Sequence, residues 1–215
     1  MDVKSYMATE LITVTPQTTV MQALDLMKAH GIRRLPVVVG EKQLVGLLTE
    51  ELIAHHSPST ATSLSVHELN YLLNKTTAQD IMIKNVVTVQ QDTFLEEAAI
   101  LMRTRNVGVL PVVEDNNTLV GIITDKDIFD AFVDILGYRT PGTRLVVEME
   151  DEPGVFEEIT RTLKEQDWNI GQIAVYHQDE KALVVIHVES GRVDDIADSI
   201  AQKGFRIVSA VKKNI

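Results

Sequence analysis

The sequence predicts a mixed α/β (α+β) protein, with two copies of one β-α-β-β-α unit followed by a smaller βαββαβ domain. Three observations predict this class. The segment 4–56 aligns with 79–131 without a gap, and apolar residues in both copies recur at helix and strand spacing. The break at 137–142 is rich in turn residues, and the pattern after it differs. Apolar residues make up 45% of the 215-residue chain, which is enough for a sizeable core.

The internal repeat keeps one register from Met7 with Met82 to Ile53 with Ile128. The identical pairs in between include Thr13/Thr88, Val14/Val89, Ala23/Ala98, Met27/Met102, Leu35–Val38 over Leu110–Val113, and Leu44–Gly46 over Leu119–Gly121. A gap-free match of this length indicates a duplication. Neither copy alone covers its three-stranded sheet, so we expect the two copies to pack together as a pseudo-symmetric pair.

Each copy is predicted to run through the same elements. A short extended piece comes first (Leu11–Val14 and Val86–Val89), followed by a helix with one apolar face, capped by Thr18 or Thr93. Two strands then form a hairpin around a polar turn, and a helix closes the unit. The expected bounds are Leu35–Val39, Gln43–Leu48 and Glu50–His55 in the first copy, and Leu110–Val113, Thr118–Ile123 and Asp125–Leu136 in the second.

The segment between the copies is predicted to be a turn followed by a helix. Ser57–Ser63 is rich in turn residues, Ser65–Glu68 has capping-box spacing, and apolar residues then recur at helical spacing from Val66 to Leu73. A DNA-binding helix-turn-helix is the alternative, but Lys75 is the only base of this helix, which favours a packing or spacer helix. The predicted boundaries are 1–57 for the first copy, 58–78 for the linker helix, 79–136 for the second copy and 143–212 for the last domain.

Composition and charge exclude several classes of function. The chain has no cysteine, so it has no disulfide framework and no thiolate nucleophile. A net charge of −11 repels phosphate backbones and anionic lipids, so we expect no nucleic-acid or membrane partner. No Walker loop, nucleophile elbow or zinc-ligand spacing occurs, so we expect no enzyme activity, metal or catalytic cofactor. The lack of a signal peptide or membrane-length apolar run predicts a soluble cytoplasmic protein.

The strand-to-helix junction of the second copy, Gly121–Asp127, carries the most specific chemistry. Free N–H groups at a helix start favour an anion, and Thr124 can cap the helix or donate to a phosphate. The Asp127 carboxylate lies one turn in, where it can accept both hydroxyls of a ribose. The same two residues also suit a capping box with no ligand, so both alternatives stay open on the residues alone.

This junction, with Leu-Pro-Val-Val before it and a second copy in the first repeat, closely resembles the CBS repeat over about residues 1–135. The resemblance implies a regulatory module with two clefts between its repeats. It implies an adenosine-containing ligand such as AMP, ATP or S-adenosylmethionine, whose phosphate and ribose lie at the Thr and Asp positions. It also implies adenine contacts at Thr13, Ile32, Pro36, Thr88, Val107, Val109 and Pro111.

The first repeat departs from this pattern, because Leu52 stands where the second repeat has Asp127 and cannot bind a diol. Glu50 and Glu51 also place negative charge at its anion end. We therefore expect a first cleft that is weak, empty or used for another ligand, formed by Thr13, Ile32, Pro36 and Thr49. Arg33 and Arg34 alternate in direction, so one of them either reaches a phosphate or belongs to a solvated basic edge. The expected nucleotide-binding set is Thr124, Asp127, Lys126, Thr88, Val107, Val109, Pro111, Arg33 and Arg34.

The C-terminal third predicts a ferredoxin-like βαββαβ order. The expected elements are strand Arg144–Glu150, a helix with Val155, Phe156, Ile159 and Leu163 as its apolar face, strands Trp168–Tyr176 and Lys181–Val188, a helix marked by Val193 to Ala201, and strand Phe205–Val211. Asp-Glu-Pro-Gly-Val-Phe and the later Trp-Asn-Ile-Gly resemble the ACT domain over about residues 143–212. That resemblance implies pairing between chains and an amino-acid effector near Asp151, Gly154 and Asn169, although Pro153 and Gly154 also suit a turn with no ligand.

Two CBS-type repeats before an ACT-type domain resemble the bacterial acetoin-utilisation protein B family in length and order. The resemblance implies a ligand-sensing protein that acts on an unknown protein partner in acetoin or butanediol catabolism. We expect a homodimer or a larger assembly, because both kinds of domain leave faces that need cover. The alternative is a dimerisation scaffold or adaptor that binds no ligand.

Overall fold

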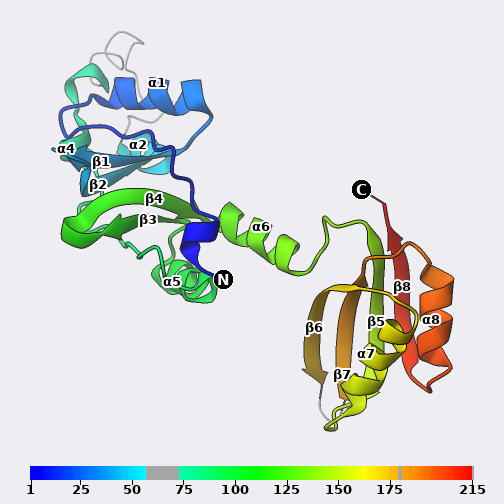
Figure 1. The fold of residues 1–215 in the computed structure, drawn as a ribbon. Helices are drawn as coiled ribbons and strands as arrows, with labels where there is room; N and C mark the ends of the chain where they lie inside the picture. Colours follow the sequence, from blue (N-terminus) through cyan, green and yellow to red (C-terminus); the bar gives the residue numbers. More distant parts are fainter. Residues whose placement is uncertain (57–72, 179–180, 215) are drawn as a thin grey trace. The chain divides into compact units, whose positions relative to one another are not determined.

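The computed structural model describes residues 1–56, 73–178 and 181–214. Its contacts divide the chain into two compact units, Met1–Ile128 and Phe129–Ile215 (Figure 1). The linker helix expected from Ser65 lies largely outside the described residues. Within the described ranges, no helix is long and apolar enough to cross a membrane, and no group of three His, Asp or Glu side chains is placed to hold a metal ion.

The first unit is built from two hairpins with helices at their ends. The first repeat contains η1 (Val3–Ser5), α1 (Val20–His30), β1 (Arg34–Val39), β2 (Gln43–Thr49) and α2 (Glu50–His56). The second contains α4 (Ala78–Ile81), α5 (Leu95–Arg105), β3 (Val109–Glu114), η2 (Asp115–Asn117), β4 (Thr118–Thr124) and α6 (Asp125–Ile135), which continues into the second unit. These elements confirm the helix–hairpin–helix order predicted for each copy.

The two hairpins join in one four-stranded sheet with the order β1-β2-β4-β3. Strands β2 and β4 meet at Gln43 and Thr118, which are counterparts in the repeat. A local two-fold relation between the copies therefore passes through this pair. The small buried core beside it is again made of counterparts, Val38 with Val113 and Leu44 with Leu119.

The segment that leads into each repeat (7–14 and 82–89, called here the crossing segment) pairs first with the hairpin of the other repeat and then with the hairpin of its own. The crossing bridges are Ala8 with Ile122 and Ile83 with Leu47, and the returning bridges are Val14 with Val37 and Val89 with Val112. The two crossing bridges are counterparts, as are the two returning ones. The extended pieces expected at 11–14 and 86–89 are therefore isolated bridges and not strands, because each segment passes from one hairpin to the other.

A glycine in the second strand of each hairpin lets a methionine of the crossing segment approach. A Cβ atom on Gly46 would collide with the Met82 side chain, and a Cβ atom on Gly121 would collide with Met7. Both glycines are buried. The identical Met and Gly positions in the two copies therefore serve the packing between the repeats.

The helix caps differ from those that the sequence predicts. Thr19, and not Thr18, accepts a hydrogen bond from the first turn of α1, and α5 follows Phe94 without a side-chain cap. The hydroxyls of Thr18 and Thr93 accept instead from the N–H groups three residues before them. The predicted caps were wrong because both hydroxyls close the turn that precedes the helix.

The second unit is a sheet with two helices on one face. It contains β5 (Gly142–Glu150), α7 (Val155–Glu165), β6 (Ile170–Gln178), β7 (Lys181–Val188), α8 (Val193–Ala201) and β8 (Arg206–Lys213). The antiparallel strands lie in the order β6-β7-β5-β8, which confirms the predicted ferredoxin-like topology. Alternate residues of β5 and β7, such as Leu145 and Ile186, are fully buried against Ile159 of α7 and Ile196 of α8.

Candidate ligand-binding site between the repeats

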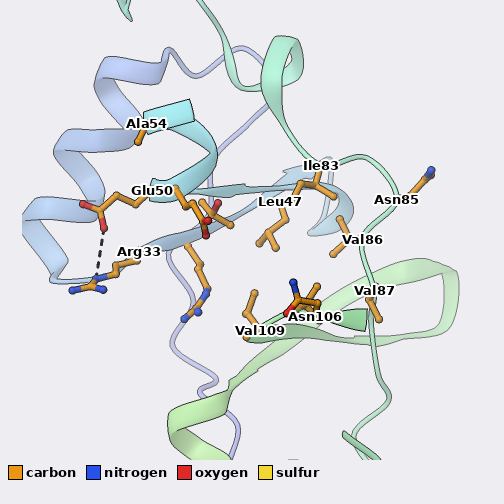
Figure 2. A pocket seen from close by; sticks show the side chains of 15 residues that line it. Arg33, Leu47, Glu50, Ala54, Ile83, Asn85, Val86, Val87, Asn106 and Val109 are labelled. Atoms are coloured by element: carbon orange, nitrogen blue, oxygen red, sulfur yellow. Dashed lines mark ion pairs between the residues drawn. The ribbon is translucent and has the colours of Figure 1, made fainter. Parts of the chain in front are cut away.

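A cavity of about 580 Å³ lies between the two repeats (Figure 2). The first repeat lines it with Arg33, Arg34, Leu47, Thr49, Glu50, Glu51 and Ala54, and the second lines it with Ile83, Asn85, Val86, Val87, Asn106, Val107, Gly108 and Val109. The β2–α2 junction therefore forms one wall, and the crossing segment with the start of β3 forms the other. A concave space of this volume is in the range of small-molecule sites in proteins.

The interior of the cavity is mainly apolar. Leu47 and Val109 are buried, and Val86 and Val107 are half-buried. Figure 2 shows Leu47, Val86 and Val109 around a common space. Apolar walls with a few polar groups nearby are typical of sites that hold a flat ring and orient its polar substituents.

Four charged side chains line the cavity, and its two cations differ in their partners. Arg33 Nε lies 3.6 Å from Glu50 Oε2, and the Arg33 side chain is 80% exposed. Arg34 is half-buried and forms no ion pair within 4.0 Å with any residue that the structure describes. A partly buried cation without a carboxylate partner favours an anionic group on whatever fills the cavity.

The missing side chain of Gly108 makes room for Arg34. A Cβ atom on Gly108 would lie 2.8 Å from Arg34 Nη2 and 3.1 Å from Asp125 Oδ2. The Arg34 guanidinium therefore reaches from the first repeat to the start of β3 in the second. Gly108 has Arg33 as its counterpart, so the two copies differ in side-chain volume where they meet.

Thr49 caps α2 at the edge of the cavity. Its Oγ1 atom accepts a hydrogen bond from the Leu52 N–H at 3.0 Å. Leu52 itself does not line the cavity. Leu52 therefore cannot bind a ribose as an aspartate could, but its side chain does not fill the cavity.

Thr124 and Asp127 form a capping box at the start of α6. Asp127 Oδ2 accepts from the Thr124 N–H at 2.7 Å and from the Thr124 hydroxyl at 2.8 Å. Thr77 and Asp80, which do not line the cavity, make the same two bonds at the start of α4. These bonds are therefore capping chemistry and do not by themselves identify a ligand site. Both use Oδ2, so Asp127 Oδ1 makes no hydrogen bond to a described residue.

The cavity brings together five of the predicted residues, Arg33, Arg34, Thr49, Val107 and Val109. Thr124, Lys126 and Asp127 lie at the β4–α6 junction and do not line it. We expected both arginines and both valines to share a cleft with Asp127, whereas the structure places them in a cleft with Thr49. The cavity is walled by the β2–α2 junction of the first repeat, where Thr49 stands in the position that Thr124 has in the second repeat.

The remaining predicted adenine contacts have structural roles and do not line the cavity. Pro36 and Pro111 are buried, and their carbonyl groups accept from the N–H groups that follow Thr13 and Thr88, at 3.0 and 3.1 Å. Ile32 donates its N–H to the last turn of α1. These residues hold the returning bridges and the helix end in place.

Sequence reasoning missed the contribution of Asn85, Val86 and Val87. These residues belong to the crossing segment, which the sequence places beside its own hairpin. The bridge between Ile83 and Leu47 carries them into the cleft of the other repeat. No spacing pattern within one copy signals this exchange.

Within the second unit, the three residues that were expected to bind an amino-acid effector do not lie together. Asp151 follows β5 and contacts His177 Nδ1 at 2.8 Å, whereas Asn169 precedes β6 and donates to Glu189 at 2.6 Å. Strands β5 and β6 both run antiparallel to β7, so these two positions lie at opposite ends of the sheet. Gly154 precedes α7 with φ of 91°, which fits the turn that the alternative proposed.

Comparison with protein families agrees with this geometry. The model of the CBS domain matches residues 3–58 and 78–134, which comprise the two copies with their crossing segments. The chain belongs to the CBS domain family. The cavity thus lies between the two CBS repeats, as the resemblance implied for a ligand cleft.

Two similar proteins from one archaeon are longer than this chain. Protein MJ1225 of Methanocaldococcus jannaschii is 27% identical over 210 residues, which cover 95% of this chain and 62% of the relative. Inosine-5′-monophosphate dehydrogenase of the same organism is 34% identical over 148 residues, which cover 69% of this chain and 27% of the enzyme. The chain therefore spans less than two thirds of either relative.

Solved CBS pairs share the fold of the first unit. The CBS pair of protein MJ0100, in complex with 5′-methylthioadenosine and S-adenosyl-L-methionine, is 30% identical with a TM-score of 0.52, over 62% of this chain and 97% of that one. CBSX2 in complex with AMP is 29% identical with a TM-score of 0.52 and the same coverage. A Vibrio cholerae protein assigned to acetoin utilization (AcuB) is 29% identical with a TM-score of 0.54, over 65% of this chain and 95% of that one.

Proposed function

We propose that this protein is a regulatory sensor that binds an adenosine-containing ligand between its CBS repeats. The observation that carries the proposal is the cavity of about 580 Å³, which residues of both repeats line. CBS pairs of the same fold hold AMP, 5′-methylthioadenosine or S-adenosyl-L-methionine, which supports this class of ligand. A ligand that contacts both repeats stabilises their packed arrangement, and a partner protein can read that change.

The cavity offers separate surfaces for the base and for an anionic group. Val87, Val107 and Val109 form an apolar wall against which a purine can lie. Arg34 offers a half-buried positive charge, and Thr49 offers a hydroxyl at the start of α2. This division of chemistry favours an adenosine ligand that carries a phosphate or a carboxylate.

We propose a second, separate ligand position at the β4–α6 junction, where the sequence predicts contacts with a phosphate and a ribose. Asp127 Oδ1 is free to accept a ribose hydroxyl while Oδ2 keeps its two bonds to Thr124. The MJ0100 pair is solved with two different adenosine ligands, which supports two positions in one pair. Lys126, which is exposed beside Asp127, adds positive charge there.

The wider role follows the architecture. We propose that the sensor regulates acetoin or butanediol catabolism, in support of which stands its likeness to the Vibrio cholerae protein. We further propose that the ferredoxin-like unit is an ACT-type domain that pairs chains in a cytoplasmic homodimer. The competing function is a scaffold that pairs chains without a ligand.

Calorimetric titration of the whole chain with AMP, ATP, S-adenosylmethionine and 5′-methylthioadenosine tests the proposal. We expect at least one of them to bind saturably, in two events per chain. Val87→Phe narrows the cavity and should remove one event, and Asp127→Ala should weaken the other about tenfold. Each variant is the control for the other position. A flat titration with all four ligands at millimolar concentration would reject the sensor and favour the scaffold.

A further inference from the structure

A row of side chains crosses the face of the second unit's sheet that its helices leave open. The row consists of Gln172 on β6, His187 on β7, Arg144 on β5 and Val211 on β8, which are cross-strand partners in register. The next residue of β5, Leu145, points to the opposite face and packs in the core with α7 and α8. The row therefore marks a surface that α7 and α8 do not cover.

The segment that leads from α6 into β5 lies over this row. Its contacts are the Thr140 carbonyl with His187 Nε2 at 3.0 Å, Gly137 against the Gln172 side chain, and the Tyr138 ring with Lys213 Nζ, 2.8 Å from the ring centre. Gly137 has φ of 65°, and a Cβ atom on it would meet the end of the Gln172 side chain, so the position favours glycine. The segment 137–140 is thus fastened to the sheet at three points.

A pocket of about 400 Å³ lies beside this segment. Its lining consists of Phe132, Val133 and Leu136 with Tyr138, Arg144, Val211 and Lys213. Phe132 and Tyr138 are each 59% exposed, and Val211 is 50% exposed. Large apolar side chains that remain this open around a pocket favour an occupant with an apolar body.

Both charged side chains of the lining are positive. Arg144 and Lys213 are half-buried, and neither forms an ion pair within 4.0 Å with a carboxylate in the described part of the chain. Burial lowers the pKa of His187 in the same row; Glu189 opposes this, while Arg144 and Lys213 lower it further. The pocket is therefore a positive site in a chain whose net charge is −11.

We propose that this pocket binds a small monocarboxylate with a branched apolar body. The carboxylate pairs with Arg144 and Lys213, and the apolar body lies against Phe132, Leu136 and Val211. A free amino acid fits less well, because no carboxylate of the lining is available to its ammonium group. Binding here fastens the segment 137–140 more tightly to the sheet, independently of any adenosine ligand in the first unit.

Three probes with one carbon skeleton test this proposal: 4-methylpentanoate, 4-methylpentanamide and leucine. Each is titrated into the whole chain with labelled methyl groups, and the signals of Val133, Leu136 and Val211 are followed by NMR. We expect 4-methylpentanoate to shift these signals saturably with a Kd of about 1 mM, which is ordinary for so small a ligand. The amide and leucine should bind about tenfold more weakly. The amide has no negative charge for Arg144 and Lys213, and the ammonium group of leucine has no carboxylate partner in the lining.

Arg144→Met should weaken the binding of 4-methylpentanoate about tenfold. Lys212→Met is the matched control, since Lys212 is exposed and alternates to the other face of β8, and it should leave the affinity unchanged. The melting temperature of each variant shows that it folds, and Lys213→Met replaces Arg144→Met if that variant does not. Equal binding of acid and amide, tighter binding of leucine, or full affinity in the cation variant would overturn the proposal.

Discussion

The Asp127 carboxylate accepts two hydrogen bonds from Thr124, and both end on the same oxygen. The cap of α6 and the proposed contact with a ribose therefore use different oxygens of one side chain. Thr77 and Asp80 are built in the same way at the start of α4. The chain thus contains a matched pair of caps, of which only one lies at a proposed ligand position.

Asp127→Ala should lose both the cap and the ribose contact. We expect it to lower the melting temperature and to weaken AMP at the β4–α6 position about tenfold, since it removes a charge-assisted hydrogen bond. Asp80→Ala removes only a cap and should leave AMP binding unchanged. Calorimetry and thermal unfolding of both variants give the comparison. Equal weakening of AMP in both would assign the effect to folding.

Arg34→Met should discriminate between ligands with and without a negative charge. The half-buried Arg34 lines the cavity and has no carboxylate within 4.0 Å among the described residues. We expect AMP to bind the cavity about tenfold more weakly in the variant, and 5′-methylthioadenosine to bind as before. Arg33→Met is the control, because Arg33 is largely exposed and lies near Glu50. A parallel loss for both ligands would mean that Arg34 only shapes the cavity.

Gly46→Ala and Gly121→Ala should destabilise the CBS pair to a similar degree. In each case the new methyl group meets a methionine of the crossing segment. We expect each variant to lose about 1–3 kcal/mol of unfolding free energy, measured by urea denaturation, as is usual for overpacking. Gly191→Ala is the control, because its methyl group meets only the flexible end of Lys212 at 3.2 Å. An unchanged stability in both strand variants would show that the methionines rearrange at no cost.

The stability of the second unit should fall in mild acid. Burial lowers the pKa of His187 below its ordinary value of 6.5, so the folded chain holds its imidazole neutral where the unfolded chain is protonated. The unfolded state therefore binds more protons, and the unfolding free energy decreases as the pH drops below 6.5. His187→Gln should reduce this pH dependence of the melting temperature, whereas His30→Gln, at an exposed residue, should not. The same slope in wild type and His187→Gln would contradict the assignment.

The order of the elements could be predicted from the sequence because it depends on local patterns. The duplicated hairpins and the βαββαβ order follow from apolar spacing and turn residues, and the structure confirms both. The cap of α1 was misplaced because Thr18 and Thr19 are neighbours with equal capping chemistry, and α5 begins after Phe94 with no side-chain cap. Which hydroxyl turns toward the helix depends on the preceding turn, which the helix pattern does not encode.

The position of the cavity could not be predicted in the same way. The sequence has Leu52 in the first repeat where the second repeat has Asp127. This difference predicted that the first cleft would bind a ligand weakly or not at all. The cavity is instead lined where Gly108 leaves room for Arg34 and where the bridge at Ile83 carries Val86 and Val87 to the other repeat. Both are contacts between distant segments, and only the folded chain shows them.

The crossing bridges at Ala8 and Ile83 determine how the pair can be taken apart. A fragment with one repeat would keep its hairpin but lose the segment that packs on its glycine, leaving backbone groups of β2 or β4 without their partner. We expect such a fragment to recover these contacts by exchanging segments with another copy, as a swapped dimer does. The duplication joins the two halves of that exchange in one polypeptide. Each half therefore meets the other at a fixed effective concentration, however dilute the protein is.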